Sequence, residues 1–278
     1  MNRPQFPKIS IVTPSFNQGH FLGGTIDSIL SQNYPNLEYI IIDGGSSDES
    51  VDVIKRYADK LTYWISEPDK GRGDAINKGF KHATGEIMAW LGCGDKYCPW
   101  ALQVVSQIFS QLPEVEWLTT GSPILWDIKG LPILCAFNYG YSKQAFKDGC
   151  YLPTIMTLQQ ESTFWRRSLW DRADGYVDAE LAKVPDFELW ARFFKYDEVY
   201  TTSVPLGGIC AHPGQDLASH KYLSVGKNIW RKYFYNNRTP LLFKVLRSWF
   251  KKHRMQTVEY NFETGQWQIK QISAKIFS

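Results

Sequence analysis

The stretch Lys8-Ile-Ser-Ile-Val-Thr-Pro-Ser-Phe-Asn17 is a run of β-branched apolar residues that ends in a polar turn. Residues 39–46, 61–67 and 86–95 repeat this design, and a segment with helical apolar spacing separates each run from the next. Strands that alternate with helices build strand–helix–strand units. The sequence therefore predicts an α/β fold with a mainly parallel central sheet flanked by helices.

Polar side chains collect where these predicted strands end. They are Thr13, Asn17, Asp43, Glu67, Asp69 and Asp95. Parallel sheets bind ligands at the carboxyl ends of their strands. A crevice lined by hydroxyls and carboxylates suits a sugar nucleotide, with a divalent cation to relieve the charge repulsion. The sequence has neither a Gly-x-Gly-x-x-Gly after the first strand nor a Lys-Ser/Thr phosphate loop.

Composition narrows the class of protein. At 278 residues the chain fits one large α/β domain with an appendage, or two small domains, and 44% hydrophobic residues are ample for a core. No apolar run approaches the roughly 20 residues that span a bilayer. Residues 1–7 lack the apolar stretch of a secretion signal, and the five cysteines form no CxxC pair. We expect a cytoplasmic protein with reduced thiols, peripheral on the inner face of the membrane if it meets one.

Residues 227–254 carry nine Lys or Arg and no acid, so the rest of the chain has 31 − 9 = 22 basic against 28 acidic groups. Aromatic and aliphatic residues are interleaved with the basic ones, and Pro240 divides the segment into two predicted helices. One interpretation is a helical pair packed on the main domain with a solvated basic face. The other is a segment on anionic lipid with aromatics at headgroup depth. No nucleic-acid motif is present, so we expect no nucleic-acid partner.

Further elements follow from local pattern. We expect helices at 21–33, 72–84, 100–112, 167–173 and 186–196, and a helix that opens with the capping box Ser46-Ser-Asp-Glu49. Strands are expected at 115–120, 160–165 and 199–211, and residues 257–262 and 266–272 alternate about a Gly turn like a hairpin.

Seven motifs, in order, resemble the family-2 glycosyltransferases, which have the nucleotide-binding fold called GT-A. They are Ile-Val-Thr-Pro-Ser-Phe-Asn17, Ile-Ile-Asp-Gly-Gly-Ser-Ser-Asp48, Glu67-Pro-Asp-Lys-Gly71, Asp74-Ala-Ile-Asn-Lys-Gly79, Gln160-Glu-Ser-Thr-Phe-Trp-Arg-Arg167, Asp186-Phe-Glu-Leu-Trp190 and His212-Pro-Gly-Gln215. The resemblance covers roughly residues 8–215. It implies a GT-A domain at 1–215, with a nucleotide-sugar half at 1–120 and an acceptor half at 121–215. Residues 216–278 are then a basic, aromatic and helical C-terminal extension that ends in the hairpin.

The resemblance implies an inverting glycosyltransferase that moves a sugar from a nucleotide sugar, with UDP-sugars favoured, to a hydroxyl of a lipid-linked or cell-surface glycan. An alternative is a catalytically weakened nucleotide-sugar-binding or scaffold subunit. A nucleotidyltransferase is a third, but the turn Thr13-Pro-Ser-Phe-Asn-Gln-Gly19 lacks the basic residue that such an enzyme usually carries there.

The implied donor site starts with Asp43, whose counterpart accepts a hydrogen bond from the ring N–H of uracil. Asp43 is alternatively a turn residue that caps backbone amides. Arg72 either pairs with the diphosphate or balances a neighbouring Asp. The full implied donor set is Thr13, Pro14, Ser15, Asn17, Asp43, Gly45, Ser46, Glu67, Asp69, Arg72, Asp74 and Asn77.

The implied metal ligand is Asp95, whose carboxylate would hold Mn²⁺ or Mg²⁺ against the two phosphates. Relatives usually have a second acid just before it, where this chain has Gly94. His212 is either another ligand or a structural hydrogen-bonding histidine. Lys96 is an alternative source of positive charge.

The implied catalytic base is Asp186, which would take the proton from the acceptor hydroxyl. It also reads as the N-cap of the helix at 186–196, and the two roles are compatible because a helix N-terminus holds a carboxylate and lowers its pKa. Glu161, Trp165 and Arg166 are expected to shape the sugar or acceptor pocket, with Trp165 alternatively a core residue.

Overall fold

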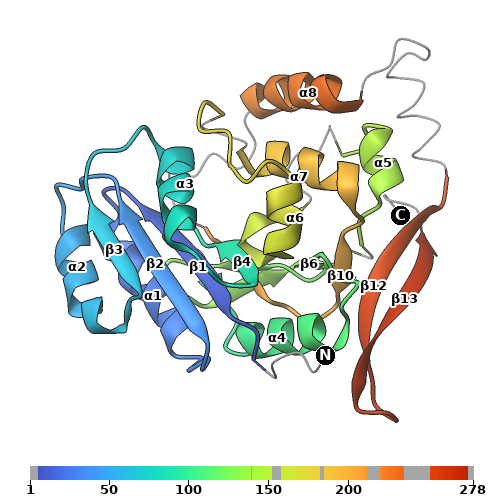
Figure 1. Cartoon of the computed structure of the whole chain (residues 1–278), viewed down its shortest axis with the longest axis horizontal. Coiled ribbons are helices and arrows are strands. Elements are labelled where there is room, and N and C mark those ends of the chain that lie inside the picture. Colours follow the sequence, from blue (N-terminus) through green and yellow to red (C-terminus); the bar gives the residue numbers. More distant parts are fainter. Residues whose placement is uncertain are drawn as a thin grey trace.

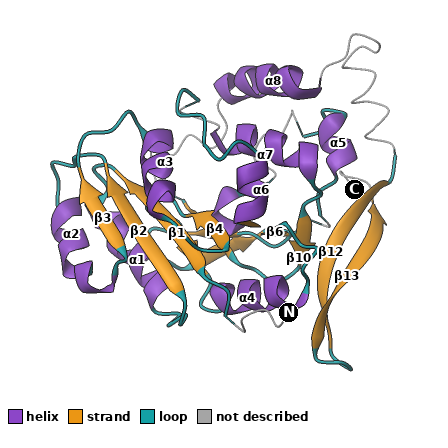
Figure 2. Cartoon of the chain, viewed as in Figure 1, coloured by secondary structure: helices purple, strands orange, loops and turns teal. Residues whose placement is uncertain are grey.

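The computed structural model describes residues 6–138, 140–151, 158–181, 185–211, 220–234 and 251–274. A nine-stranded sheet runs in the order β13-β12-β10-β6-β9-β4-β1-β2-β3, and a four-stranded sheet runs β5-β11-β7-β8. In Figure 1, β1 to β4 lie at one side of the molecule and the β12–β13 hairpin lies at the other. Helices lie on both sides of the large sheet (Figure 2). The predicted α/β class with a mainly parallel sheet is confirmed.

The first half alternates strands and helices as the sequence predicts. Its elements are β1 (Ile9–Ser15), α1 (Gly19–Leu30), β2 (Leu37–Asp43), α2 (Ser50–Arg56), a 3₁₀ turn (Ala58–Lys60), β3 (Tyr63–Ser66), α3 (Arg72–His82) and β4 (Ile87–Trp90). All four strands are parallel, and Ser15, Asp43 and Ser66 lie side by side at their carboxyl ends. The polar strand ends therefore share one sheet edge.

Successive residues of the central strands pack on opposite faces, because side chains alternate along a strand. On one face Val12 packs with Ile76 and Phe80 of α3. On the other, Ile11 packs with Leu22 of α1. Both faces are covered, which explains why these strands read as continuous apolar runs rather than as alternating ones.

The second half is less regular. Its elements are β5 (Lys96–Tyr97), α4 (Ala101–Gln111), β6 (Trp117–Thr120), β7 (Ile124–Trp126), β8 (Pro132–Cys135), α5 (Lys143–Lys147), a 3₁₀ turn η3 (Gln160–Ser162), β9 (Phe164–Arg166), α6 (Arg167–Arg172), α7 (Pro185–Tyr196), β10 (Tyr200–Thr202), β11 (Gly207–Cys210), α8 (His220–Phe234), β12 (His253–Asn261) and β13 (Gln266–Ala274). Strand β9 lies antiparallel between β4 and β6 and joins the two halves of the sheet.

Three local predictions are wrong. Residues 160–165 form η3 followed by the start of β9, not one strand. Residues 199–211 form β10 and β11 in different sheets, because the chain turns away at Pro205, which cannot donate to a ladder. The capping box also fails: the Ser46 hydroxyl donates to Asp43 instead, and Asp48 Oδ1 accepts the backbone N–H of Ser50 where α2 begins.

Four buried tryptophans fill the space between the sheet and α7. Trp165 is 0% exposed and packs against Trp90 and Trp190, and Trp117 packs against Trp190. Aromatic contacts of this kind stabilise a core beyond the area that they bury. The core interpretation of Trp165 therefore holds, and its expected place in a ligand pocket does not.

The C-terminal hairpin of β12 and β13 is as predicted, and it also extends the large sheet, since β12 pairs in parallel with β10. In α8 the Trp230 side chain is buried and donates to the carbonyl of Phe146, and the Tyr233 hydroxyl donates to Glu188. The Trp230 ring is therefore not available to lipid, whereas the Tyr233 ring is only half-buried. Residues 235–250, with Pro240, lie outside the described residues, and the domain boundaries stay predictions.

No helix in the described ranges is both long enough and apolar enough to cross a membrane.

Candidate active site

Asp43 ties together the turns at the carboxyl ends of β1, β2 and β3. Its carboxylate is fully buried and accepts the Ser46 N–H at 2.9 Å, the Ser46 hydroxyl at 2.6 Å and the Ser66 hydroxyl at 2.6 Å. Asn17 joins the same turns, because its Oδ1 accepts the Ser47 N–H at 2.9 Å. Asp43 thus acts as the turn residue that one interpretation expected, and its contact with a base stays a prediction.

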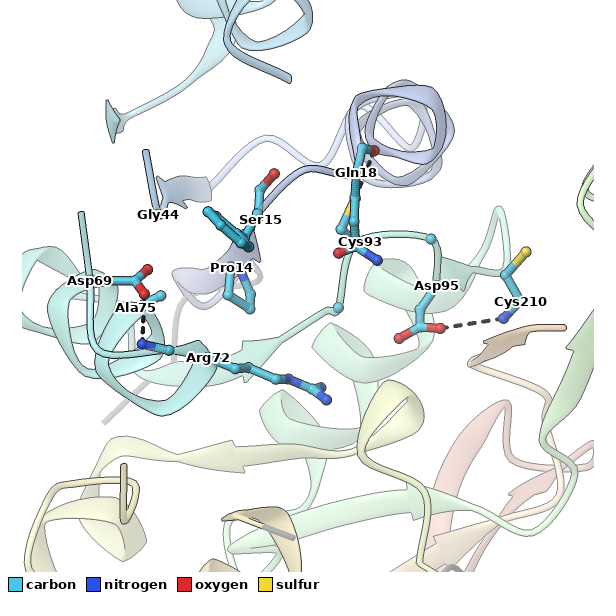
Figure 3. Close-up of a pocket in the computed structure, with 14 residues that line it drawn as sticks. Pro14, Ser15, Gln18, Gly44, Asp69, Arg72, Ala75, Cys93, Asp95 and Cys210 are labelled. Carbon is cyan, nitrogen blue, oxygen red and sulfur yellow. Dashed lines mark hydrogen bonds between the residues drawn. The ribbon is translucent and has the colours of Figure 1, made fainter. Parts of the chain in front are cut away.

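A cavity of about 640 Å³ opens beside these turns (Figure 3). Its lining residues are Pro14, Ser15, Phe16, Gln18, Gly44, Asp69, Gly71, Arg72, Ala75, Gly92, Cys93, Gly94, Asp95 and Cys210. Of the predicted donor set, Pro14, Ser15, Asp69 and Arg72 line it. The sequence did not predict Phe16, Gln18 and Cys210 as site residues. Phe16 lies within the motif that ends at Asn17, and Gln18 follows it, whereas Cys210 lies in no quoted motif.

The other predicted donor residues do not line this cavity. Thr13 is buried, and its hydroxyl pairs with the Tyr39 hydroxyl at 3.1 Å. Glu67 and Asp74 both face Lys78, at 2.9 and 3.6 Å. The Asn77 amide donates to the carbonyl of Val177 and accepts its N–H, so it clamps α3 to that loop. Local hydrogen bonding and ion pairing, rather than a ligand, account for these side chains in this structure.

Arg72 reaches from the first turn of α3 across the cavity toward Asp95 (Figure 3). Its Nη2 donates to Gln160 Oε1 at 3.0 Å, and the amide of Gln160 donates in turn to the carbonyl of Trp90 at the end of β4. Gln160 is 2% exposed. It is a site residue that the sequence reasoning missed, although it lies beside Glu161 in a quoted motif.

Gly92 allows Arg72 and Asp95 to approach the same point. A Cβ at Gly92 would lie 2.6 Å from Asp95 Oδ2 and 3.5 Å from Arg72 Nη2. The first distance is shorter than two such atoms tolerate, so a side chain at position 92 would displace the carboxylate. The glycine therefore serves the geometry of the site.

Three carboxyl groups share the field of Arg72. Burial raises the pKa of Asp95 well above its usual range, the charge of Glu161 raises it further, and Arg72 lowers it. Burial likewise raises the pKa of Glu161 to about 7 against the lowering effect of Arg72. Burial raises the pKa of Asp186, which Arg72 again lowers. Clustered carboxyls with raised pKa values beside one cation are typical of a functional site.

Asp186 lies in the first turn of α7, which begins one residue earlier at Pro185. It is therefore inside the helix and not at the N-cap, as one interpretation had it, since proline at the first helical position fixes the backbone there. The backbone N–H of Phe187 bonds to its carboxylate and lowers its pKa, although burial has the larger, opposite effect. The helix N-terminus still favours its negative charge.

Glu161 lies in η3, and the negative charge of Asp186 contributes to the raised pKa of its carboxyl group. Its Oε2 is buried and finds no hydrogen-bond donor among the described residues. A buried acceptor in that state costs free energy until a donor arrives. Glu161 is thus the one residue of the predicted sugar or acceptor pocket that lies with the cluster.

Arg166 does not lie with the site. Its guanidinium donates to the carbonyls of Val115 and Phe109 and pairs with Glu86, at the opposite end of β4. It closes the C-terminal end of α4, where unpaired carbonyls attract cations. Its expected role in a pocket is therefore wrong. Trp165 and Arg166 are neighbours in β9, so their side chains point to opposite faces of the sheet, and neither points into the cavity.

The turn before β5 presents Asp95 to the cavity. The Asp95 N–H bonds to the Gly92 carbonyl at 3.1 Å, with Gly94 at φ +98°, and Asp95 Oδ1 accepts the Cys210 N–H at 3.3 Å. Lys96 points elsewhere, since its Nζ lies over Gly130. Arg72, not Lys96, is therefore the cation beside Asp95.

The side chains around Asp95 supply one ligand suited to a divalent cation, but not a complete set. Asp95 offers a hard oxygen donor at the cavity, and Mg²⁺ is often held by one or two carboxylates with substrate phosphates and water. Within the described ranges, no group of three His, Cys, Asp or Glu side chains stands ready to hold a metal. His212 lies outside those ranges, so its predicted role stays a prediction.

The sequence model of the family described as Glycosyl transferase family 2 matches residues 10–112. An uncharacterized glycosyltransferase of Mycobacterium tuberculosis is 32% identical over 189 residues, which cover 66% of this chain and 69% of the relative. One from Rickettsia prowazekii is 30% identical over 195 residues, 70% of this chain and 61% of the relative. The match thus spans only about three fifths of the length of that relative.

Solved structures share the fold at low identity. The S. aureus TarS 1–349 complex with UDP-GlcNAc superposes with a TM-score of 0.63 at 16% identity, over 85% of this chain and 69% of that one. The mannosyltransferase PcManGT of Pyrobaculum calidifontis, in complex with GDP-Man and Mn²⁺, gives 0.55 at 18% identity, over 87% and 68%. With a fold of the GT-A type and these relatives, the chain belongs to glycosyltransferase family 2.

Proposed function

We propose that the protein is an inverting glycosyltransferase that uses a nucleotide sugar, with UDP-sugars favoured. The observation that carries this proposal is the position of Arg72 among Asp95, Glu161 and Asp186, beside a cavity at the carboxyl edge of a parallel sheet. A cation there attracts the diphosphate, and carboxyls with raised pKa values suit proton transfer.

In the proposed reaction, the acceptor hydroxyl oxygen bonds to the anomeric carbon of the donor while the bond from that carbon to the phosphate oxygen breaks. Asp186 takes the hydroxyl proton, and the nucleoside diphosphate leaves. Attack from the face opposite the leaving group inverts the anomeric configuration. Arg72, held by Gln160, offsets the charge that grows on the leaving diphosphate.

We propose Mn²⁺ or Mg²⁺ as the cofactor, which the carboxylate of Asp95 would help to hold beside the donor. Such an ion neutralises the diphosphate as a Lewis acid. PcManGT, which shares the fold, was solved with GDP-Man and Mn²⁺.

The proposed acceptor is a lipid-linked or cell-surface glycan. The exposed basic residues Lys227, Arg231 and Lys232 of α8 support a contact between residues 227–254 and an anionic membrane. Because screening weakens such attraction, the protein should co-sediment with anionic vesicles at low salt and detach at high salt.

A screen of nucleotide sugars tests the proposed function. The correct donor at 100 times its dissociation constant should stabilise the protein by about 2.7 kcal/mol in thermal unfolding. A coupled assay should then detect release of nucleoside diphosphate when acceptor glycans are added. Failure of every nucleotide sugar to bind would contradict the proposal.

A second candidate is a subunit that binds the nucleotide sugar without turnover. Gly94 favours it, because this position lacks the second acid that strengthens a metal site. Donor binding without release of nucleoside diphosphate, for any acceptor tested, would select this candidate.

A further inference from the structure

The hairpin formed by β7 and β8 exposes large apolar side chains that nothing in the proposed reaction uses. Ile128, Leu131, Ile133 and Leu134 are 59%, 61%, 57% and 58% exposed. They fall within seven consecutive residues at and after the turn of one hairpin. A contiguous exposed apolar surface of this kind usually marks a site of interaction.

Both faces of β8 are uncovered, although Trp126 of β7 is buried. Leu134 and Cys135 are neighbours in β8, so their side chains point to opposite faces, and both are exposed. Strand β8 is also the edge strand of its sheet. A protein partner that docks on one face would leave the other in water, whereas a lipid phase surrounds both.

The edge itself is poorly suited to pairing with a second copy. Strand β8 has four residues, begins at Pro132 and faces a register shift between Leu125 and Trp126. Short length, proline and bulges are the features that discourage pairing between edge strands. Side chains, rather than the backbone edge, are therefore the part of the hairpin that is available for contact.

Positive charge lies at the turn. Lys129 is exposed, and the Nζ of Lys96 lies over Gly130. The one acid of the turn, Asp127, is engaged by the backbone, since its Oδ1 accepts the N–H groups of Lys129 at 2.9 Å and Leu131 at 2.8 Å. Apolar side chains flanked by lysines match the boundary between the acyl chains and the headgroups of an anionic bilayer.

The hairpin is joined directly to the candidate active site. Strand β7 pairs in parallel with β11, and the Cys210 thiol donates to the carbonyl of Asp127 at 3.5 Å. The N–H of the same Cys210 donates to Asp95 at 3.3 Å. One residue thus connects the turn of the hairpin to the carboxylate that lines the cavity.

We propose that the β7–β8 hairpin is a lipid-contacting surface, with Ile128, Leu131, Ile133 and Leu134 in the headgroup region of an anionic bilayer. Insertion is shallow, because the unpaired backbone of β8 needs partners that the hydrocarbon core lacks. Lys96 and Lys129 contact lipid phosphates. This surface rests on the proposed function only in that it would bring the cavity close to a lipid-linked acceptor.

The first test is co-sedimentation of the whole protein with vesicles of equal phosphatidylcholine and phosphatidylglycerol. The double variant Ile128→Ser, Leu131→Ser should partition at least about tenfold less than the wild type, since it loses two apolar side chains that the bilayer would bury. Phe262→Ser is the matched control, because Phe262 is 91% exposed on the other hairpin and should leave partitioning unchanged. Equal partitioning of the double variant and the wild type would overturn the proposal.

The second test places a polarity-sensitive fluorophore on Cys135, which is the exposed one of the five cysteines. Its emission should shift to the blue when these vesicles are added. A protein that binds vesicles without this shift does so through another surface, such as residues 227–254, and that outcome also overturns the proposal.

Two further readouts separate this proposal from its alternatives. Sedimentation velocity without lipid should give the same mass for the double variant and the wild type; a dimer lost in the variant would assign the hairpin to a second copy and overturn the proposal. Nucleotide binding by the double variant should equal that of the wild type. A double variant that loses vesicle binding and keeps nucleotide binding therefore supports lipid contact by the β7–β8 hairpin. This result does not test the proposed glycosyltransferase activity.

Discussion

Arg72 Nη2 lies 3.0 Å from Gln160 Oε1, which links the start of α3 to the turn before β9. The two residues are separated by 88 positions in the sequence. Gln160 fixes the guanidinium because its own amide is anchored on the Trp90 carbonyl. The guanidinium of Arg72 is thus held by η3, which precedes the strand β9 that joins the two halves of the sheet.

The variant Gln160→Leu should weaken nucleotide binding by about tenfold, because a hydrogen bond to a charged group contributes roughly 1.5–3 kcal/mol and Arg72 would lose its support. Calorimetric titration with UDP measures this. Gln144→Leu, on an exposed position of α5, is the control. Unchanged affinity in Gln160→Leu would show that Arg72 is positioned without it.

The variant Asp186→Asn should lower turnover by about 10²–10⁴-fold and leave donor binding nearly intact, since a general base acts on the acceptor. Rates of nucleoside diphosphate release and thermal shifts with donor give the two quantities. A comparable loss of nucleotide affinity would instead assign Asp186 to the donor site or to folding.

Asp95→Ala should abolish donor binding that depends on Mn²⁺, measured with and without EDTA. Gly94→Asp is the companion variant, designed to restore an acid. Position 94 has room, since its Cβ would meet no atom nearer than 3.8 Å, but its φ of +98° makes any side chain there cost on the order of 1–3 kcal/mol of stability. Higher metal affinity with a lower unfolding temperature is the expected result; an EDTA-insensitive wild type would refute the metal proposal.

Asp43→Ala should weaken binding of uridine nucleotides even in EDTA, because uracil would lose its proposed acceptor. Ser66→Ala separates this from damage to the turn, since it removes one donor to the carboxylate at 2.6 Å and keeps the acceptor. Titration with UDP and GDP distinguishes the bases. Equal losses in both variants would mean that Asp43 only shapes the turn.

Glu38 gives a prediction on stability and pH. Burial raises its pKa, but hydrogen bonds from Ser10, from the backbone and hydroxyl of Thr84 and from Lys8 outweigh this and lower the pKa from 4.5 to about 2. An acid with a lowered pKa stabilises the fold above its unfolded value, and that contribution is lost as the pH falls from 4.5 through 2.

Glu38→Gln should therefore cost on the order of 2–3 kcal/mol at pH 7 and progressively less below pH 4. Urea unfolding across this pH range measures the difference, with Glu259→Gln on the exposed hairpin as control. A cost that does not change with pH would mean that packing, rather than the charge, accounts for the loss.

The first half of the fold follows from sequence because its signals are local. Apolar runs buried on both faces, interrupted by helices, leave little choice but parallel strand–helix–strand units. The second half depends on contacts between distant segments. Nothing in Gln160–Arg166 indicates that the segment would cross antiparallel between β4 and β6, which sends Trp165 into the core and Arg166 to the end of α4.

The site was predictable to the extent that strand ends share an edge. Pro14, Ser15, Asp69, Arg72 and Asp95 meet at the cavity for that reason. Asp74 and Asn77 do not line this cavity, because a residue on a helix faces the site only at particular positions of the turn, and theirs face Lys78 and Val177. Their expected contact with the donor stays a prediction. Gln160 could not be identified without knowing that η3 approaches α3.

The position of β9 between β4 and β6 also determines the order in which the strands can pair during synthesis. Strands β1 to β4 can pair as soon as residue 90 has left the ribosome, because their pairings with one another all lie within residues 9–90. Strand β6 must wait for β9, which supplies its neighbouring edge, and β10 must wait in turn. During synthesis the strands β1 and β2, which carry Ser15 and Asp43, would therefore pair before α7, which carries Asp186, is complete. A nascent chain at that stage would lack Gln160, which holds Arg72, and Asp186, the group proposed to accept the proton.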